Sequence, residues 1–439
     1  MHVMLMTYGT RGDVQPFVAL GPGLIQKGHR VTLTAPERFA GFITDHDLEF
    51  TPLTDALIAL MDDPQFAHAS DPKASALAKL TSLFAIGKKA RALQDTLLDD
   101  IFDAIDQGKP DVIVFHPKTF GALPIARHFG IPVVMAQLIP SFIPTGDYLH
   151  MGTPDLGLRD TLGRWYNRVT GKLIYRVLNA TLRRQVQRWA ARRQNRINAK
   201  DLDIVKSCQT GTLPIIHAFS NAVISRPKDW PTHATVTGYW FLDGTTQTNP
   251  PDPALQNFVE SHKNLIYIGF GSMPGNDPTA MAEMIAKAVS QADVSAIIAT
   301  GWGGMGDIDW PSNILAVREV PHDWLFPKVD IVIHHGGAGT CAAALRAGRP
   351  SIIIPFFGDQ PFWAKRLHRL GVAPRPIKPA KLDAAMLARR IKTVLETTSY
   401  RNNAERIASK IADEDGIANA IAEITRAVGQ SDLPKTGSL

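Results

Sequence analysis

The chain is predicted to fold into two α/β units, each built on a parallel β-sheet. Apolar strands alternate with amphipathic helices in both halves, and a stretch rich in Asp, Thr, Asn and Pro at 243–253 separates the halves. Such alternation implies a parallel sheet that helices cover on both faces. At 439 residues, the chain is long enough for two domains of about 200 residues each.

The N-terminal half contains the first set of alternating elements. An apolar strand at 2–7 is followed by an amphipathic helix at 14–27 and a second strand at 30–35. A long helical stretch is expected at 77–107. The pattern then predicts a strand at 111–115, a helix at 120–129 and a strand at 132–137.

The C-terminal half repeats the pattern. Strands are expected at 264–269, 295–300, 314–317, 330–333 and 351–355. A helix is expected at 280–291, and helices fill 383–428. The expected organisation is an N-terminal unit (1–242), a linker (243–262), a C-terminal unit (263–400), terminal helices that pack back across the units (401–428) and a flexible tail (429–439).

A glycine-rich turn joins the strand at 330–333 to an Ala- and Leu-rich helix. Glycines at such a turn let backbone amides approach an anion, and the helix N-terminus adds about half a positive charge. Two side chains of the turn can donate further hydrogen bonds. The predicted phosphate loop consists of His335, Gly336, Gly337, Gly339 and Thr340.

A second polar loop follows the strand at 351–355. It contains Asp359 and Gln360, a carboxylate and an amide that can hold sugar hydroxyls. An exposed polar turn without a ligand is the alternative. Because the two loops follow neighbouring strands, one for a diphosphate and one for a sugar, they indicate a nucleotide-sugar site.

The block from 317 to 363 resembles the donor-binding signature of family 1 glycosyltransferases, and the closer resemblance is to the sterol and lipid glucosyltransferase branch. Three further passages match: GTRGDVQPFVALG (9–21), PKDWPTHATVTGYWFLD (227–243) and FGSM (270–273). The resemblance implies the GT-B fold, with two Rossmann-like domains facing a central cleft. It also implies a UDP-sugar co-substrate and no cofactor or metal.

Asp13 is the candidate catalytic base. It lies in a glycine turn directly after the first strand, at the position where many family members have a histidine and this branch has an aspartate. The reaction needs a group that accepts the proton of the attacking hydroxyl. A carboxylate is a weak base, so partial burial or late proton transfer would have to assist. The alternative is that Asp13 caps the helix expected from residue 14.

His116 ends the strand at 111–115 on the same sheet edge, where it can pair with Asp13. In relatives with a histidine base, an acid near this strand end orients that histidine. Here the acid and the histidine have exchanged positions. An Asp–His pair can titrate as a unit near neutrality. A structural histidine at a strand end is the alternative.

The resemblance implies further donor contacts. Ser272 follows a strand and can donate to the phosphates, while Trp302, beside glycines, can lie against the nucleoside or simply fill a loop. His322 matches a position at which plant relatives contact the uracil. Gly12 and Val320 complete the expected donor-binding residues.

Two positions depart from the plant pattern. Glu319 stands where those relatives have a tryptophan, and Ala343 stands where they have a ribose-binding glutamate. These departures put the base and ribose contacts in doubt and leave the phosphate loop intact.

Other chemistries lack support in the sequence. Asp201 and Asp203, like Asp307 and Asp309, have the spacing of a metal motif, but neither pair follows an apolar strand in a Gly-rich context. No G-x-S-x-G elbow of a serine hydrolase is present. The N-terminus lacks the pattern of a signal peptide, and no run approaches the roughly 20 apolar residues of a membrane span, so a cytoplasmic location is expected.

The positive charge is concentrated in one segment. Residues 158–198 contain eleven Lys or Arg and one acid, with apolar residues at helical spacing between them. Gly163 and Gly171 are expected to divide this helix. Solvated arginines on helices of the acceptor domain are one interpretation, and peripheral contact with an anionic membrane is the other. Nucleic-acid binding is not expected, since aromatic stacking partners are sparse.

The sequence favours an inverting glycosyltransferase that moves a hexose, with glucose favoured over other hexoses, from a UDP-sugar to a hydroxyl of a hydrophobic acceptor. Residues 137–143 are expected to line the acceptor pocket. A nucleotide-sugar 2-epimerase of the same fold and a non-catalytic protein that binds UDP-sugar are the two rivals.

Overall fold

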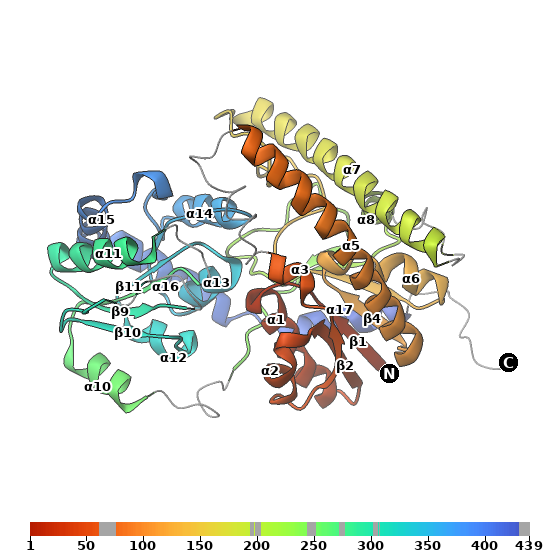
Figure 1. The fold of residues 1–439 in the computed structure, drawn as a ribbon, viewed down its shortest axis with the longest axis horizontal. Coiled ribbons are helices and arrows are strands. Elements are labelled where there is room, and N and C mark those ends of the chain that lie inside the picture. Colours follow the sequence, from red (N-terminus) through yellow and green to blue (C-terminus); the bar gives the residue numbers. More distant parts are fainter. Residues whose placement is uncertain are drawn as a thin grey trace. The chain divides into compact units, whose positions relative to one another are not determined.

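The computed structural model describes residues 1–60, 76–193, 197, 203–243, 252–271, 277–301, 306 and 308–429 (Figure 1). The chain forms two compact units, which we call unit 1 and unit 2. Unit 1 comprises Met1–Phe219, Arg226–Leu242 and the chain from Asp415 onward. Unit 2 comprises Ser220–Ser225 and Asp243–Glu414.

Unit 1 is built on a seven-stranded parallel sheet with the strand order β3-β2-β1-β4-β5-β6-β7. The strands are β1 (His2–Met6), β2 (Arg30–Pro36), β3 (Glu49–Leu53), β4 (Val112–Phe115), β5 (Val133–Gln137), β6 (Ile215–His217) and β7 (Ala234–Val236). The last two are short and, like β3, were not predicted. Each of these three strands nevertheless pairs in parallel, and in a defined register, with a neighbouring strand.

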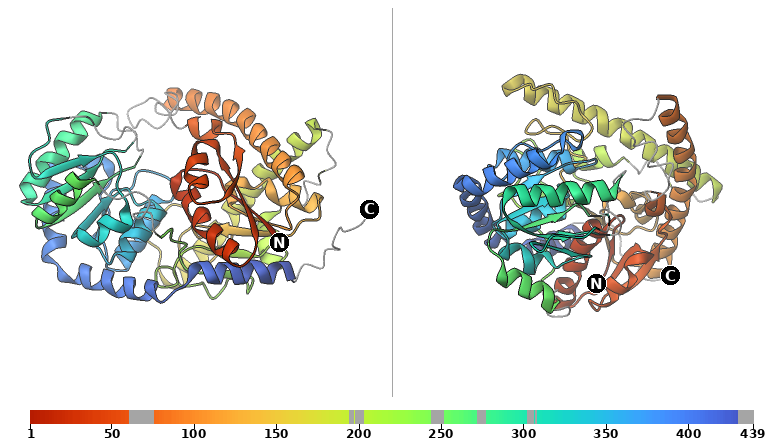
Figure 2. Two further views of the ribbon diagram at one scale, coloured as in Figure 1. Left: turned by 90° about the horizontal axis from the view of Figure 1, so that it is seen from below. Right: turned by 60° about the vertical axis from the view of Figure 1, so that its left-hand side comes forward.

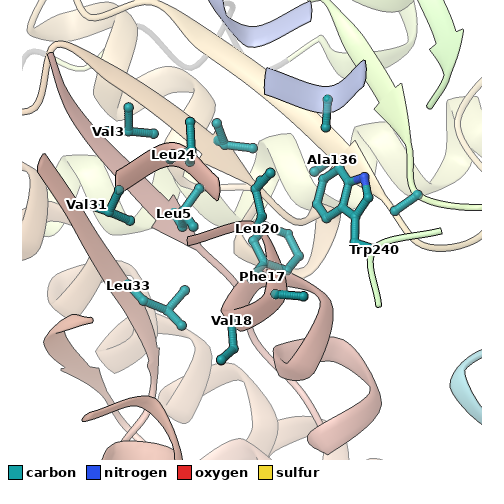
Figure 3. Close-up of a cluster of buried hydrophobic side chains, with 14 of the residues drawn as sticks. Val3, Leu5, Phe17, Val18, Leu20, Leu24, Val31, Leu33, Ala136 and Trp240 are labelled. Atoms are coloured by element: carbon teal, nitrogen blue, oxygen red, sulfur yellow. The ribbon is translucent and has the colours of Figure 1, made fainter. Parts of the chain in front are cut away.

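Helices cover both faces of this sheet. Val3 and Leu5 of β1 join a core cluster with α1 (Arg11–Gln26) and α17 (Gly416–Gly429), in which Phe17 lies edge-on to Trp240 (Figure 3). Figure 2 shows α17, in dark blue, along unit 1. The alternate residues of β1 point the other way and are also fully buried. Burial on both faces explains why these strands are continuously apolar.

The remaining helices of unit 1 are α2 (Ala40–Thr44), α3 (Ala56–Ala59), α5 (Ala76–Gly108), α6 (Ala122–His128), α7 (Asp160–Arg192) and α8 (Ile204–Thr210). In the part of the chain that the structure describes, no helix combines the length and apolar character needed to cross a membrane.

Unit 2 has a five-stranded parallel sheet with the order β10-β9-β8-β11-β12. Its strands are β8 (Leu265–Gly269), β9 (Ser295–Ala299), β10 (Ile314–Val317), β11 (Ile331–His334) and β12 (Ser351–Ile353). Its helices are α10 (Pro253–Ser261), α11 (Pro278–Ala292), α12 (His322–Leu325), α13 (Ala338–Arg346), α14 (Gln360–Arg369), α15 (Ala384–Glu396) and α16 (Thr398–Ala412). Alternate residues of β8 enter two separate core clusters, one on each face of the sheet.

The predicted elements recur within a few residues of their expected bounds, with one exception. α7 is a continuous helix of 33 residues, so the expectation that glycines divide it is wrong. Gly163 and Gly171 lie on its buried side. A Cβ at Gly171 would come within 2.3 Å of the His150 ring, and one at Gly163 within 2.7 Å of a backbone oxygen. Both glycines therefore provide room for close packing.

Two expected segments, the linker and the tail, do not correspond simply to parts of the structure. The linker expected at 243–262 includes α10, and the expected tail lies almost wholly outside the described residues.

Candidate active site

Both sheets contain a point at which the strand order reverses. In unit 1 it lies between β1 and β4, and in unit 2 between β8 and β11. In open parallel sheets, ligands bind outside the carboxyl ends of the strands at such points. Asp13 follows β1, and His116 follows β4 directly, with its N–H donating to the Met6 carbonyl at 2.8 Å. His335 follows β11 in the same way.

Asp13 is the third residue of α1, because the helix begins at Arg11 and not at the expected residue 14. Thr10 is the N-cap, and its backbone N–H donates to Asp13 Oδ2 at 2.8 Å. Asp13 is therefore not the N-cap that we considered; its carboxylate instead bonds back to the N-cap from the third helical position, as in a capping box. This bond holds the carboxylate at the positive end of the helix.

Lys118 is the closest charged partner of Asp13, and the sequence analysis missed it. Its ammonium lies 2.8 Å from Oδ1 and 2.9 Å from Oδ2 of the carboxylate. Gly9, at φ +136°, leaves room for this pair, since a Cβ there would fall 2.1 Å from Asp13 Oδ2. The available signal was a lysine two residues beyond His116, at the same sheet edge as Asp13.

His116 is buried and lies with its ring edge-on to Phe17. Its Nδ1 accepts the Lys118 backbone N–H at 3.3 Å, so in a neutral ring the proton is on Nε2. That nitrogen lies 3.9 Å from Asp13 Oδ1, beyond hydrogen-bond distance. Burial lowers the pKa of His116 to about 4, against the opposing effect of Asp13. The ring is therefore neutral at pH 7, whereas we expected a pair that titrates near neutrality.

Several groups determine the charge of Asp13. Burial raises the pKa of the carboxyl, but the Lys118 ammonium, His116 and hydrogen bonds from Lys118 and Thr10 outweigh it, so the pKa of Asp13 is below its usual value. The carboxylate is ionised at neutral pH. It can accept a proton, although a lowered pKa makes it a weak base.

The predicted phosphate loop of unit 2 turns sharply between β11 and α13. His334 is fully buried, and its Nδ1 accepts the Gly336 N–H at 3.1 Å. Gly336 has φ +92°, and a Cβ there would lie 2.7 Å from Ile353. A side chain is excluded at this position, so the backbone passes close to β12.

The N-terminus of α13 is open. Gly337 is its N-cap, no side chain among the described residues caps the helix, and its first turn contains no acid. Gly339 is exposed, with no atom of the described residues within 4 Å of a Cβ built on it, and Thr340 is half-buried in the same turn. Burial lowers the pKa of His335 to about 4, so this ring is neutral at pH 7. The turn thus presents backbone amides and neutral side chains, a set suited to a phosphate.

The predicted sugar residues have different environments. Asp359 is half-buried, and its Oδ2 accepts the indole N–H of Trp363 at 2.9 Å. Gln360 is buried, and its Oε1 accepts the backbone N–H groups of Phe356 and Phe357 at 2.8 and 3.1 Å. The amide oxygen of Gln360 therefore shapes the loop that carries Asp359, which the sequence did not indicate.

The remaining donor-side predictions are only partly described. His322 stacks on Phe326 with ring centroids 4.3 Å apart, and its Nε2 lies 3.3 Å from the Tyr267 hydroxyl. Val320 is buried beside it in the chain. Gly12 is exposed in the first turn of α1. Ser272 and Trp302 lie outside the described residues, as do Asp201 and Asp307.

Comparison with known families shows which class of protein the chain resembles. Residues 3–107 match the family described as the glycosyltransferase family 28 N-terminal domain. Residues 282–426 match the family described as erythromycin biosynthesis protein CIII-like, C-terminal domain. The two parallel-sheet units have the GT-B fold, and these matches show that the chain is similar to glycosyltransferases of that fold.

Within that class, the chain is similar to sterol 3-beta-glucosyltransferases. The protein of that name from Saccharomyces cerevisiae is 34% identical over 433 residues, which is 96% of this chain and 34% of the relative. The one from Arabidopsis thaliana is 32% identical over 439 residues, which is 96% of this chain and 64% of the relative. The chain thus spans less than two thirds of the length of either relative.

Solved structures share the fold. The glycosyltransferase of kitacinnamycin has a TM-score of 0.69 and 17% identity, covering 97% of this chain and 98% of that one. CalG4, the calicheamicin glycosyltransferase, has a TM-score of 0.66 and 17% identity, covering 98% and 99%. Spinosyn rhamnosyltransferase SpnG, complexed with thymidine diphosphate, has a TM-score of 0.60 and 17% identity, covering 96% and 99%.

Proposed function

We propose that the protein transfers glucose from UDP-glucose to a hydroxyl of a sterol or another hydrophobic lipid, with inversion at the anomeric carbon and without a metal. The observation that carries this proposal is the ionised carboxylate of Asp13 at the reversal point of unit 1, in a chain about a third identical to sterol 3-beta-glucosyltransferases. Action at the cytoplasmic face of a membrane is part of the proposal.

Asp13 is the proposed base. The oxygen of the acceptor attacks the anomeric carbon, the bond from that carbon to the diphosphate oxygen breaks, and the acceptor proton passes to Asp13. Oδ2 already accepts bonds from Thr10 and Lys118. Oδ1 has Lys118 at 2.8 Å and the more distant His116, so Oδ1 is the oxygen that we assign to the acceptor. Because the carboxylate is a weak base, the proton moves late, once the new bond has made the hydroxyl acidic.

His116 is proposed to be an electrostatic neighbour of Asp13 and not a second base. Its neutral ring directs the Nε2 proton toward Oδ1, so this nitrogen cannot accept the proton of the acceptor. The ring and Lys118 together favour the ionised form of the carboxylate.

The leaving diphosphate is proposed to lie against the open N-terminus of α13. The amides of the first turn and the side chains of His335 and Thr340 would stabilise the charge that develops on the leaving oxygen. Asp359 is the proposed ligand of the sugar hydroxyls, with Gln360 setting the shape of its loop. His322 is proposed to adjoin the nucleobase.

The rival functions have less support. A 2-epimerase needs no lipophilic acceptor, whereas the relatives reported above are named for transfer to sterols. A non-catalytic protein would have no need of a carboxylate held ionised by Lys118.

A turnover assay tests the proposal. The protein is incubated with ergosterol, cholesterol or a mixed lipid extract and with UDP-glucose or dTDP-glucose, and products are read by mass spectrometry. A sterol hexoside formed from UDP-glucose, absent with Asp13→Asn, is the expected result. A product formed from dTDP-glucose in preference to UDP-glucose would contradict the donor assignment. No hexoside from either donor, despite measurable UDP binding, would contradict the transferase.

A further inference from the structure

Helix α7 presents a stripe of apolar side chains to solvent. The stripe residues recur at steps of three or four positions, which places them on one side of the helix. Trp165 is 60% exposed and Leu173 is 62% exposed. We call this surface the α7 stripe; it consists of Leu162, Trp165, Val169, Leu173 and Val177, and the exposed Leu156 and Leu158 lie just before the helix. Contiguous exposed apolar side chains of this kind mark an interaction surface.

The opposite side of α7 is already used by the fold. Trp189 is buried, and its indole N–H donates to Asp99 of α5 at 2.8 Å, while Arg193 pairs with Asp103 at 3.2 Å. α5 and α7 lie side by side in Figure 1. Gly171 and Tyr175 pack against His150 nearer the N-terminal end of the helix. The helix is thus fixed to unit 1 with its apolar stripe outward, and rotation to bury the stripe would break these contacts.

Positively charged side chains lie beside the stripe. Lys172 follows Val169, and Arg176 follows Leu173, by three positions each, so both lie beside it. Further along α7 there is a hollow of about 560 Å³ whose lining includes Arg176, Arg183, Arg184 and Lys206, with Asp203 as its acid. The Arg183 Nε is buried there and has no hydrogen-bond partner among the described residues. This nitrogen is a donor that lacks an acceptor, in a cationic surrounding.

We propose that the α7 stripe and the cationic hollow dock the protein on an anionic phospholipid bilayer. The stripe enters the boundary between headgroups and acyl chains, and the hollow takes a lipid phosphate. The charge argues for a lipid occupant: in a symmetric pairing of two copies through this face, the cations of both copies would meet. Trp165 is the one aromatic residue of the stripe, too few for the stacking that single-stranded nucleic acid requires.

Docking at α7 has a consequence for the acceptor, which rests on the proposed function. Phe142, in the segment expected to line the acceptor pocket, stacks on Tyr175 of α7 with ring centroids 5.6 Å apart. That segment therefore lies directly under the helix that meets the bilayer. A lipid acceptor would reach it over a short path from the membrane.

Vesicle flotation tests the docking without any sugar or acceptor. The full chain is mixed with phosphatidylcholine vesicles containing about 30% phosphatidylglycerol, or with phosphatidylcholine vesicles alone. We expect the protein to float with the anionic vesicles and to be released by salt, since exposed charges are screened within about 10 Å at 0.1 M. Leu173→Asp should lower the bound fraction by about tenfold, and Arg184→Glu by about fivefold or more.

The control is Ile25→Asp, an equal change at an exposed apolar residue of α1, which should float as the wild type does. Thermal melting of each variant shows that the fold is retained. Equal flotation of wild type and Leu173→Asp, or no flotation with anionic vesicles, would overturn the proposal. A dimer that Leu173→Asp dissolves, seen by light scattering without lipid, would overturn it in favour of a second copy. Flotation without sterol hexoside formation would leave docking standing and remove the proposed function.

Discussion

Each unit has a strand-to-helix turn beside the reversal point of its sheet, and the N-termini of the two helices differ in charge. In unit 1, the N-terminus of α1 is occupied by a carboxylate of the chain itself: Asp13 accepts the Thr10 N–H at 2.8 Å and pairs with Lys118. In unit 2, the N-terminus of α13 has no acid in its first turn and no side-chain cap from the part of the chain that the structure describes. The N-terminus of α1 already has a carboxylate of the chain beside it, whereas the N-terminus of α13 is open to an anion from a ligand.

This difference matches the two tasks of the proposed transferase. An ionised carboxylate is stabilised by a helix N-terminus and a nearby cation, as α1 and Lys118 provide for Asp13. The same helix geometry stabilises a diphosphate only where the chain contributes no anion of its own, as in α13. We therefore expect that changing the charge at one of these helix N-termini removes one task, proton acceptance or diphosphate binding, and leaves the other.

Removal of the charge in unit 1 should have the largest effect. Asp13→Asn retains a hydrogen-bond acceptor for the Thr10 N–H and so retains the capping box, but it cannot take the proton. We expect kcat to fall by about 10²- to 10⁴-fold. UDP affinity, measured by calorimetry, should not change, since unit 2 is untouched. A loss of UDP binding equal to the loss of turnover would show that the two tasks are not separate.

Addition of a charge to unit 2 is the converse change. Gly339→Asp places a carboxylate in the open first turn of α13, where a Cβ would meet no atom of the described residues within 4 Å. We expect UDP to bind about tenfold more weakly or worse, because the new anion would occupy the proposed site of the diphosphate. The same anion should stabilise the fold by about 0.3–1 kcal/mol at low salt through the helix dipole.

Gly339→Ala is the matched control for that change. It supplies the gain in helix propensity of about 0.5–1 kcal/mol without the charge. Its UDP affinity should stay within a few-fold of the wild type. If Gly339→Ala weakens UDP binding as much as Gly339→Asp, then backbone freedom at this position, and not charge, explains the open turn.

The sequence predicted what depends on pattern and connectivity. Strands apolar on both faces, alternating with amphipathic helices, define parallel sheets, and the carboxyl ends of β1 and β4 then bring Asp13 and His116 to one edge. What the sequence could not show depends on packing. The reach of Lys118 to Asp13 requires the space above Gly9, and the continuity of α7 through Gly171 requires the close approach of His150.

The pH dependence tests the role of Lys118. The pKa of Asp13 is depressed, so the carboxylate stays ionised as the pH falls toward 4 and the rate is lost only below that range. Lys118→Met removes an opposing charge and should raise the pKa of Asp13, which moves the acid limb of the kcat–pH profile to higher pH. At pH values above the acid limb, we expect kcat of Lys118→Met to differ from the wild type by less than about tenfold. Lys118→Arg should keep the wild-type limb; an unshifted limb in Lys118→Met would assign the low pKa to other groups.

The smallest expected effect concerns the cap itself. Thr10→Ala keeps the backbone N–H that binds Asp13 but removes the hydroxyl, which lies 3.2 Å from Asp13 Oδ2. The free energy of unfolding, measured in urea, should fall by about 0.5–2 kcal/mol at pH 7. The part that comes from ionised Asp13 is present above the ordinary pKa of about 4 and is lost as the pH falls through the depressed value. The difference between variant and wild type should therefore shrink in acid. A difference that stays constant down to pH 3 would mean that the hydroxyl of Thr10 stabilises α1 independently of the carboxylate, and that α1 is capped as an ordinary helix is.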